Sequence, residues 1–391
     1  MSDRNAQLTT SKAPAQGPAQ MPHIPASATG VITVDLRQIR TNWRSLSERV
    51  APAECGAVVK ADAYGLGAAR VIPALNAAGC RSFFVATPGE AIAARRLAPE
   101  ATIYALDGLL PGAGAELIGC GAVPVLASLE EVREWAALAT DSGRRLPAAL
   151  HVDTGLNRLG LSWSDVSVLD GEGFIERIDL RLVMSHLACA DNAVDPKNEE
   201  QREAFDKMRW YFPDVRASLA ASDGLMLGAP YHYDLVRPGY ALYGGQAFQG
   251  SPTPVAPVVT VKARVLQVRY VAQGESVGYS ATWRPTRPSR IAVIAAGYED
   301  GLARALSRGS GEAGLCVAIG GALAPIVGRV SMDLVTVDVT KLKVPPARGD
   351  FVDIIGPGLS IEAMGAAAGT IGYEVLTHLA ARFHRHYVDS D

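Results

Sequence analysis

The sequence lacks the features that mark a nucleic-acid-binding, membrane-spanning or disulfide-bonded protein. Lys and Arg number 37 together and Asp and Glu 40, so no excess of charge favours nucleic acid or an anionic membrane. The five cysteines are scattered and contain no Cys-x-x-Cys pair, which favours a reducing compartment over a disulfide framework or a zinc site. No stretch is long and apolar enough to cross a membrane, and no short tandem repeat is present.

Residues 1–29 lack the continuous apolar core of a signal peptide. Ala, Pro, Gln and Ser dominate this segment, so we expect a disordered tail on a cytoplasmic protein. The whole chain of 391 residues is 48% hydrophobic and 20% charged, an ordinary globular composition with room for two domains.

Between residues 37 and 251, short apolar runs alternate with helical patterns. From the run that ends at Lys60, about eight units of a strand followed by a helix extend over roughly 200 residues, which predicts a (β/α)₈ barrel. A doubly wound open sheet is the alternative, and periodicity does not exclude it. In a barrel, residues just past the strands share one face and build the active site. The residues expected on that face are Lys60, Arg158, His186, Ser222 and Arg237.

Residues 252–391 differ in sequence pattern from residues 37–251. Prolines open the segment, an alternating apolar run follows, and short strands with Gly-rich turns then dominate. Helical patterns remain only near 361–368 and 374–383. We therefore predict a separate, mainly β domain. An alternating run at 30–36 predicts one further strand ahead of the barrel.

Lys60 is the first candidate catalytic residue, because it ends a buried strand and precedes a loop at 62–67. An ammonium group held there loses water, which lowers its pKa from about 10.4. A neutral amine serves both Schiff-base chemistry and general-base catalysis. Taken alone, the stretch favours a lysine that simply extends to solvent.

A series of motifs changes that interpretation. In chain order they are VVKADAYGLG, HVDTGLNRLG, the strand-end His186, LVRPGYALYG, VGYSATW, GYEDGL, GRVSMDL and TIGYE. Each is weak alone, but together, in this order and at compatible spacing, they make residues 30–387 resemble the alanine racemases. The resemblance implies a barrel that binds pyridoxal 5′-phosphate (PLP) and a C-terminal β domain that residues 30–36 join. It also implies a head-to-tail homodimer in which β-domain groups enter the partner's site.

The resemblance assigns most cofactor contacts to the barrel. Lys60 matches the lysine that binds PLP covalently and then acts as one of two catalytic bases. Arg237 matches the arginine that faces the pyridine nitrogen, where a fixed cation disfavours ring protonation and side reactions. Arg158 matches the contact to the phenolic oxygen and the substrate carboxylate. His186 matches the link between Arg237 and the catalytic tyrosine. Phosphate contacts are implied for Tyr64, Ser222, Gly239 and Tyr240, and Tyr373 is counted with the cofactor-binding residues.

The substrate contacts are assigned mainly to the β domain. Tyr279 matches the second base, on the opposite face of the substrate Cα from Lys60, because racemisation in a fixed pose needs a base on each side. Met332 and Asp333 match a loop that meets the substrate carboxylate through backbone N–H groups. Tyr298 and Tyr373 match tyrosines that narrow the entrance, which favours a small side chain.

The sequence departs from part of the family at His151, where some members have a carbamylated lysine that orients the arginine matched by Arg158. Imidazole forms no stable carbamate, so another group must orient Arg158. We expect an alanine racemase that supplies D-alanine for peptidoglycan. The alternatives are a racemase of serine or broad specificity, a barrel decarboxylase, and a non-catalytic PLP-carrying homeostasis protein. A decarboxylase would have an acidic residue in place of Arg237, and the homeostasis proteins lack the second domain.

Overall fold

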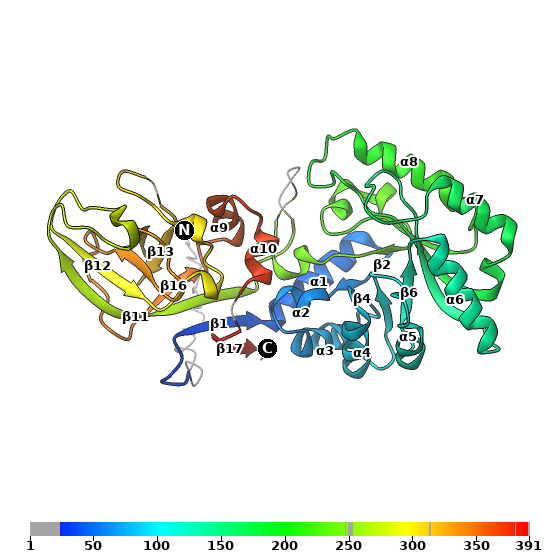
Figure 1. Ribbon diagram of the computed structural model, residues 1–391, viewed down its shortest axis with the longest axis horizontal. Coiled ribbons are helices and arrows are strands. Elements are labelled where there is room, and N and C mark those ends of the chain that lie inside the picture. Colours follow the sequence, from blue (N-terminus) through cyan, green and yellow to red (C-terminus); the bar gives the residue numbers. More distant parts are fainter. Residues whose placement is uncertain (1–23, 247, 249–252, 313, 380, 390–391) are drawn as a thin grey trace, which may run out of the picture.

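The computed structural model describes residues 24–246, 248, 253–312, 314–379 and 381–389. The expected disordered tail therefore falls mostly outside the described residues. A barrel domain and a β domain lie side by side, and helix α10 lies between them (Figure 1). The active-site candidates are distributed over both domains.

The barrel is built from parallel strands. Seven of them pair in the order β3-β4-β5-β6-β7-β8-β9, and β10 pairs in parallel with β2, which directly precedes β3. A bridge from Ala221 to Arg237 joins β9 to β10 and closes the ring, which excludes the open sheet and confirms the predicted barrel. The bounds are β2 Glu54–Cys55, β3 Ala57–Val58, β4 Ser82–Val85, β5 Thr102–Ala105, β6 Val123–Leu126, β7 Leu146–His151, β8 Ile178–Met184, β9 Arg216–Ser218 and β10 Leu235–Val236.

Helices cover the outside of the barrel. Several begin where a short polar side chain accepts an amide hydrogen bond of the first turn, as Thr87 does from Glu90 in a capping box. The bounds are α1 Leu36–Val50, α3 Ala68–Ala78, α4 Pro88–Leu97, α5 Gly114–Cys120, α6 Leu129–Asp141, α7 Trp163–Glu172 and α8 Lys197–Arg209. The sequence pattern did not predict α7, because only Val166 and Leu169 of this helix are buried in the core.

The β domain is centred on a second closed sheet. Its strands follow the order β12-β15-β14-β13-β16-β11, and β11 also pairs with β12. The pairing of β11 with β12 contains a register shift, a β-bulge, between Val265 and Gln267. β1 lies between β11 and β17 and so belongs to this sheet. The bounds are β1 Gly30–Asp35, β11 Val259–Val271, β12 Ser289–Ile294, β13 Cys316–Ile319, β14 Ala322–Val327, β15 Val335–Asp338, β16 Phe351–Ile355, β17 His384–Val388, α9 Ile361–Ala368 and α10 Gly372–Thr377.

Short 3₁₀ turns carry several of the candidate residues. They are η1 Ile175–Arg177, η2 Gly224–Leu227, η3 Ala229–Tyr231, η4 Tyr240–Tyr243, η5 Tyr279–Ala281, η6 Tyr298–Asp300 and η7 Arg304–Leu306. Within the described ranges, no helix combines the length and apolarity that a bilayer span requires.

Candidate active site

Lys60 opens a left-handed turn immediately after β3. The turn is the segment α2 (Lys60–Tyr64), in which φ runs from +52° at Ala61 to +56° at Tyr64. Such a backbone costs roughly 1–2 kcal/mol per residue, so surrounding contacts must hold it. Glu90 accepts the amide of Ala61 at 2.7 Å, and Asp62 accepts the amide of Ala68 at 2.7 Å. The predicted loop is thus a fixed turn that places Lys60 at the rim of the barrel.

Basic side chains converge beside Lys60. Part of the Lys60 side chain stays exposed, yet loss of water and then the Arg158 cation lower the pKa of its ammonium group. The direction agrees with the expectation from the sequence. The contribution of Arg158 to this shift means that the two cations lie close enough to repel each other. Two cationic groups that face one anionic ligand would be arranged in this way.

Arg237 is the most deeply buried of these cations, with 3% of its surface exposed. Its Nη2 donates to the carbonyl oxygens of Ser185 at 2.7 Å and Leu219 at 3.2 Å, and its Nη1 donates to the hydroxyl of Ser218. These acceptors are all neutral. Burial lowers the pKa of Arg237 to about 9. A buried guanidinium held only by neutral groups can stabilise an electron-rich atom of a ligand that lies against it.

Two imidazoles lie among these cations. Burial first, then the cations of Arg237 and Arg158, lower the pKa of His186 to about 3 and that of His151 to about 4. Both rings are therefore neutral at physiological pH. They separate the cations without adding charge, and each ring nitrogen can donate or accept a hydrogen bond.

Arg158 lies on a loop that begins after β7 and returns to it through a bridge between Val152 and Leu161. The Asp153 carboxylate fixes this loop by accepting the amides of Gly155, Leu156 and Asn157 at 3.0 to 3.1 Å. An acceptor shared by three amides holds the backbone that presents Arg158. Asp153 contacts only the backbone of the loop. The guanidinium group of Arg158 makes no hydrogen bond to any of the described residues.

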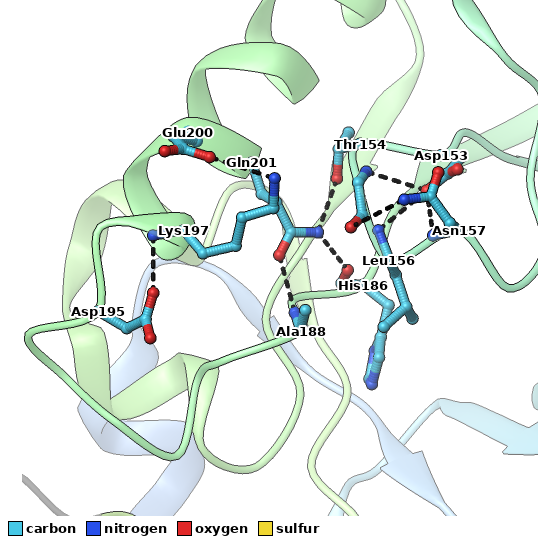
Figure 2. A network of polar contacts seen from close by, with 11 residues as sticks. Asp153, Thr154, Leu156, Asn157, His186, Ala188, Asp195, Lys197, Glu200 and Gln201 are labelled. Carbon is cyan, nitrogen blue, oxygen red and sulfur yellow. Dashed lines mark hydrogen bonds and ion pairs between the residues drawn. The ribbon is translucent and has the colours of Figure 1, made fainter.

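Gln201 of α8 supports the same loop from behind (Figure 2). Its Nε2 donates to Thr154 Oγ1 at 3.2 Å and to the His186 carbonyl at 2.9 Å, while its Oε1 accepts the Ala188 amide at 2.8 Å. The ring of His186 points away from this network (Figure 2). One buried amide thus ties the loop carrying Arg158 to the segment carrying His186.

A second group of residues forms a cradle beneath the Tyr64 hydroxyl. Ser222 Oγ accepts the amides of Gly239 at 3.0 Å and Ala241 at 3.2 Å. A Cβ atom on Gly239 would lie 2.3 Å from Tyr64 Oη, so only glycine leaves room for this hydroxyl. Tyr64 is buried, and its hydroxyl has no hydrogen-bond partner among the described residues. A hydroxyl without a protein partner, carried on a buried ring next to backbone amides, suits a phosphate group.

Tyr373 of α10 packs on this cradle within the same chain. Its ring stacks on Tyr240 at a centroid distance of 3.8 Å and lies 6.3 Å from the ring of Tyr64. Tyr373 donates to Asp223 at 3.2 Å, and Tyr240 donates to Glu362 at 3.0 Å. The expectation that all β-domain groups enter the partner's site is therefore wrong for Tyr373. The reason is that α10 turns back onto α2 of its own barrel (Figure 1).

The other β-domain candidates lie apart from the barrel group. Tyr279, Met332 and Tyr298 are 70%, 52% and 42% exposed, and Asp333 is exposed as well. Among the described residues, no hydrogen bond, ion pair or ring contact joins any of these four to Lys60 or Arg158. The structure of one chain thus brings together the cofactor candidates and Tyr373, but not the second base or the substrate loop.

Sequence reasoning missed several residues that support the site. They are Asp153, Thr154, Gln201, Ser218, Asp223 and Glu362. Asp153, Thr154, Ser218 and Asp223 lie inside or beside stretches already singled out, so position next to a motif was an available signal. Gln201 and Glu362 lie on helices with no such signal, and only the fold places them at the site.

Together these features define a barrel enzyme with a cationic site suited to a phosphorylated aromatic cofactor. The models of the alanine racemase N-terminal and C-terminal domains match residues 34–247 and 258–387. The chain therefore belongs to the alanine racemase family. Members of this family are PLP-dependent isomerases, and the recognition, the fold class and the enzyme class expected from the sequence are confirmed.

Relatives from several organisms support this assignment. The chain is 48% identical over 359 residues to the alanine racemase of Methylobacterium sp. strain 4-46, covering 92% of this chain and 97% of that protein. It is 44% identical to a catabolic alanine racemase of Mesorhizobium japonicum, and the match covers 93% of this chain and 94% of that protein. The crystal structure of alanine racemase from Bartonella henselae with covalently bound pyridoxal phosphate superposes with a TM-score of 0.88 at 40% identity, covering 92% and 100%.

Proposed function

We propose that the protein interconverts L-alanine and D-alanine with PLP bound at the end of the barrel, using Lys60 and Tyr279 as the two bases. The observation that carries this proposal is the convergence of Lys60, Arg158 and Arg237 beside a glycine cradle under an unpartnered hydroxyl. A phosphate, a phenolic oxygen and a substrate carboxylate together supply the negative charge that these cations need.

The residues fit PLP in a defined orientation. Tyr64, Ser222 and the backbone at Gly239 and Tyr240 would hold the phosphate, with Tyr373 packing over them. Arg237, tied to neutral acceptors, would face the ring nitrogen and keep it unprotonated, with neutral His186 beside it. Arg158 would contact the phenolic oxygen and the substrate carboxylate. When bound, PLP supplies an aldehyde that captures the substrate amine and a ring that accepts charge from Cα.

The chain's own part in the reaction is to remove one proton from Cα on one face and to add another proton on the opposite face. The lowered pKa of Lys60 favours a neutral amine that can take the Cα proton on one face. Tyr279 would return a proton from the opposite face, through Oη. Tyr279 is 70% exposed, and among the described residues it makes no hydrogen bond, ion pair or ring contact with the barrel of its own chain. We therefore propose that it acts in the barrel site of a second copy. Met332, Asp333 and Tyr298 would enter that site with it, meet the substrate carboxylate and narrow the entrance.

We also propose domain boundaries, a cellular location and a metabolic role for the protein. The barrel is taken as residues 37–251 and the β domain as 252–391 with the strand at 30–36, close to the bounds of the two family models. A cytoplasmic location is supported by five cysteines that all remain free. The product would supply D-alanine for peptidoglycan. A chiral assay with L-alanine and L-serine side by side tests the substrate preference.

Mixed dimers test the shared site. Lys60→Ala and Tyr279→Phe homodimers should each be nearly inactive. After subunit exchange about half of the dimers are mixed, and one site in each combines an intact lysine with an intact tyrosine. About a quarter of all sites should therefore recover activity. A mixture of two Lys60→Ala preparations is the control, and mass-tagged subunits verify exchange. If exchange occurs without recovery, both bases come from one chain.

A further inference from the structure

Two loops of the β domain lie directly against each other, and both carry residues assigned above to the substrate pocket. The amide of Tyr298 in η6 donates to the Ser331 carbonyl at 3.0 Å, and the amide of Glu299 donates to the Met332 carbonyl at 3.1 Å. A Cβ atom on Gly297 would lie 2.2 Å from the Met332 carbonyl oxygen, so the contact needs glycine there. The two loops therefore form one hydrogen-bonded unit.

A single arginine from the C-terminal segment clamps this unit. Arg382 Nε and Nη2 donate to the two carboxylate oxygens of Asp300 at 2.6 and 2.7 Å, and its Nη1 donates to Asp333 at 2.7 Å. Asp300 is 1% exposed and also accepts the amide of Gly297 at 2.9 Å. The planar guanidinium thus joins η6 to the loop of Met332 and Asp333. Charge-assisted bonds in this fork geometry are about twice as strong as neutral ones.

We propose that Arg382 is a positioning residue for the substrate, and that it acts on the partner's active site. It fixes the backbone of Met332 and Asp333 against η6, the turn that carries Tyr298, so that these groups keep one arrangement toward the substrate. The inference rests on the proposed function, because the four exposed residues reach a substrate only if the β domain completes a second barrel. A lysine cannot replace this arginine, since one ammonium group cannot make the bidentate bond to Asp300 and also reach Asp333.

The first test is Arg382→Lys, which keeps the charge and loses the fork. We expect the KM for alanine to rise about tenfold while kcat changes less than threefold, because the pocket is displaced but both bases remain. The dissociation constant of propionate, which has the carboxylate and methyl group of alanine without the amine, should rise in parallel when measured by calorimetry. The control is Arg181→Lys, because Arg181 pairs with Asp179 on the barrel at similar exposure.

A second variant covers the case in which Arg382→Lys fails to fold. Asp333→Asn leaves the bond between Arg382 and Asp300 intact, and because Asp333 is exposed its loss does not leave a buried charge. It should reproduce the rise in KM and in the propionate dissociation constant with an unchanged melting temperature and an unchanged dimer fraction. Wild-type values of both constants in either folded variant would overturn the proposal.

Heterodimers decide on which site Arg382 acts. A dimer of one Lys60→Ala chain and one Arg382→Lys chain, isolated through two different tags, has a single active barrel, on the Arg382→Lys chain. If Arg382 acts across the interface, this barrel meets an intact β domain and shows the wild-type KM. A raised KM in the heterodimer would overturn the proposal. Failure of the Lys60→Ala and Tyr279→Phe mixture to recover would instead contradict the shared site itself.

Discussion

The two halves of the site differ in how complete they are within one chain. In the barrel, Arg237, Ser222 and Tyr240 are buried, hydrogen-bonded and held by several elements. In the β domain, Tyr279 and Met332 stand on the surface, and the Arg382 clamp holds the loop of Met332 without covering it. A buried, hydrogen-bonded cofactor half and an exposed substrate half agree with the proposed shared site, because an exposed half is free to dock against another surface.

The largest expected loss of activity comes from replacing either of the two proposed bases, and only one of the two replacements should also remove the covalent cofactor. Lys60→Ala should lower kcat/KM by at least about 10³-fold and abolish covalent cofactor, because the amine itself is lost. Tyr279→Phe should lower kcat/KM by about 10²- to 10⁴-fold but keep the cofactor on Lys60. Borohydride reduction followed by peptide mass spectrometry measures the label. Lys262→Ala, which alters a surface pair with Asp353, is the control. Label on another lysine of the wild type would contradict the assignment.

A smaller effect is expected at the cradle of the barrel half. In Gly239→Ala the new Cβ would displace the Tyr64 hydroxyl, which it would meet at 2.3 Å. Loss of one bond to a phosphate should weaken PLP binding about tenfold, and Tyr64→Phe should add little to it. Fluorescence titration of the apoenzyme with PLP measures this change. Gly119→Ala, with open space around the new methyl group, should leave the dissociation constant unchanged. Equal constants for Gly239→Ala and wild type would show that the phosphate lies elsewhere.

The buried imidazoles of the barrel half predict a pH dependence of stability. The pKa of His186 is about 3 when folded and about 6.5 when unfolded, so between these values the unfolded chain binds the extra proton. The stability from a neutral His186 is complete above pH 6.5 and is lost as the pH falls, at up to about 1.4 kcal/mol per pH unit. His186→Asn should show a shallower slope in urea unfolding between pH 6.5 and 4.5. Part of the slope should remain in this variant, because the pKa of His151 is also lowered by burial. Parallel curves would contradict a buried neutral ring.

Removal of dissolved CO₂ is expected to have no effect on activity. Because the residue at position 151 is His151, whose imidazole forms no stable carbamate, the barrel half should not depend on dissolved CO₂. Activity measured after CO₂ removal should equal activity with added bicarbonate, at constant pH and ionic strength. Restoration by bicarbonate would mean that a lysine elsewhere is carbamylated. Asp153 and Gln201 hold the loop that carries Arg158 without a carbamylated lysine.

The sequence by itself determined the fold class and the position of the cationic cluster. Alternating strand and helix patterns are local, so the barrel could be predicted strand by strand. Lys60, Arg158, His186 and Arg237 follow strands, and parallel strands in a barrel end on one face, so their meeting there was predictable too. Their roles in catalysis remain predictions.

Only the tertiary structure decided the contacts between residues distant in the sequence. The left-handed turn after Lys60 depends on Glu90, the clamp joins Arg382 to Asp300, and Tyr373 stacks on Tyr240 of its own chain. No local pattern encodes such pairs, because each partner's residue type has many other uses and each contact joins segments that lie far apart in the chain. The sequence therefore indicates the chemical groups at the site, while long-range packing decides which other residues hold each of them in place.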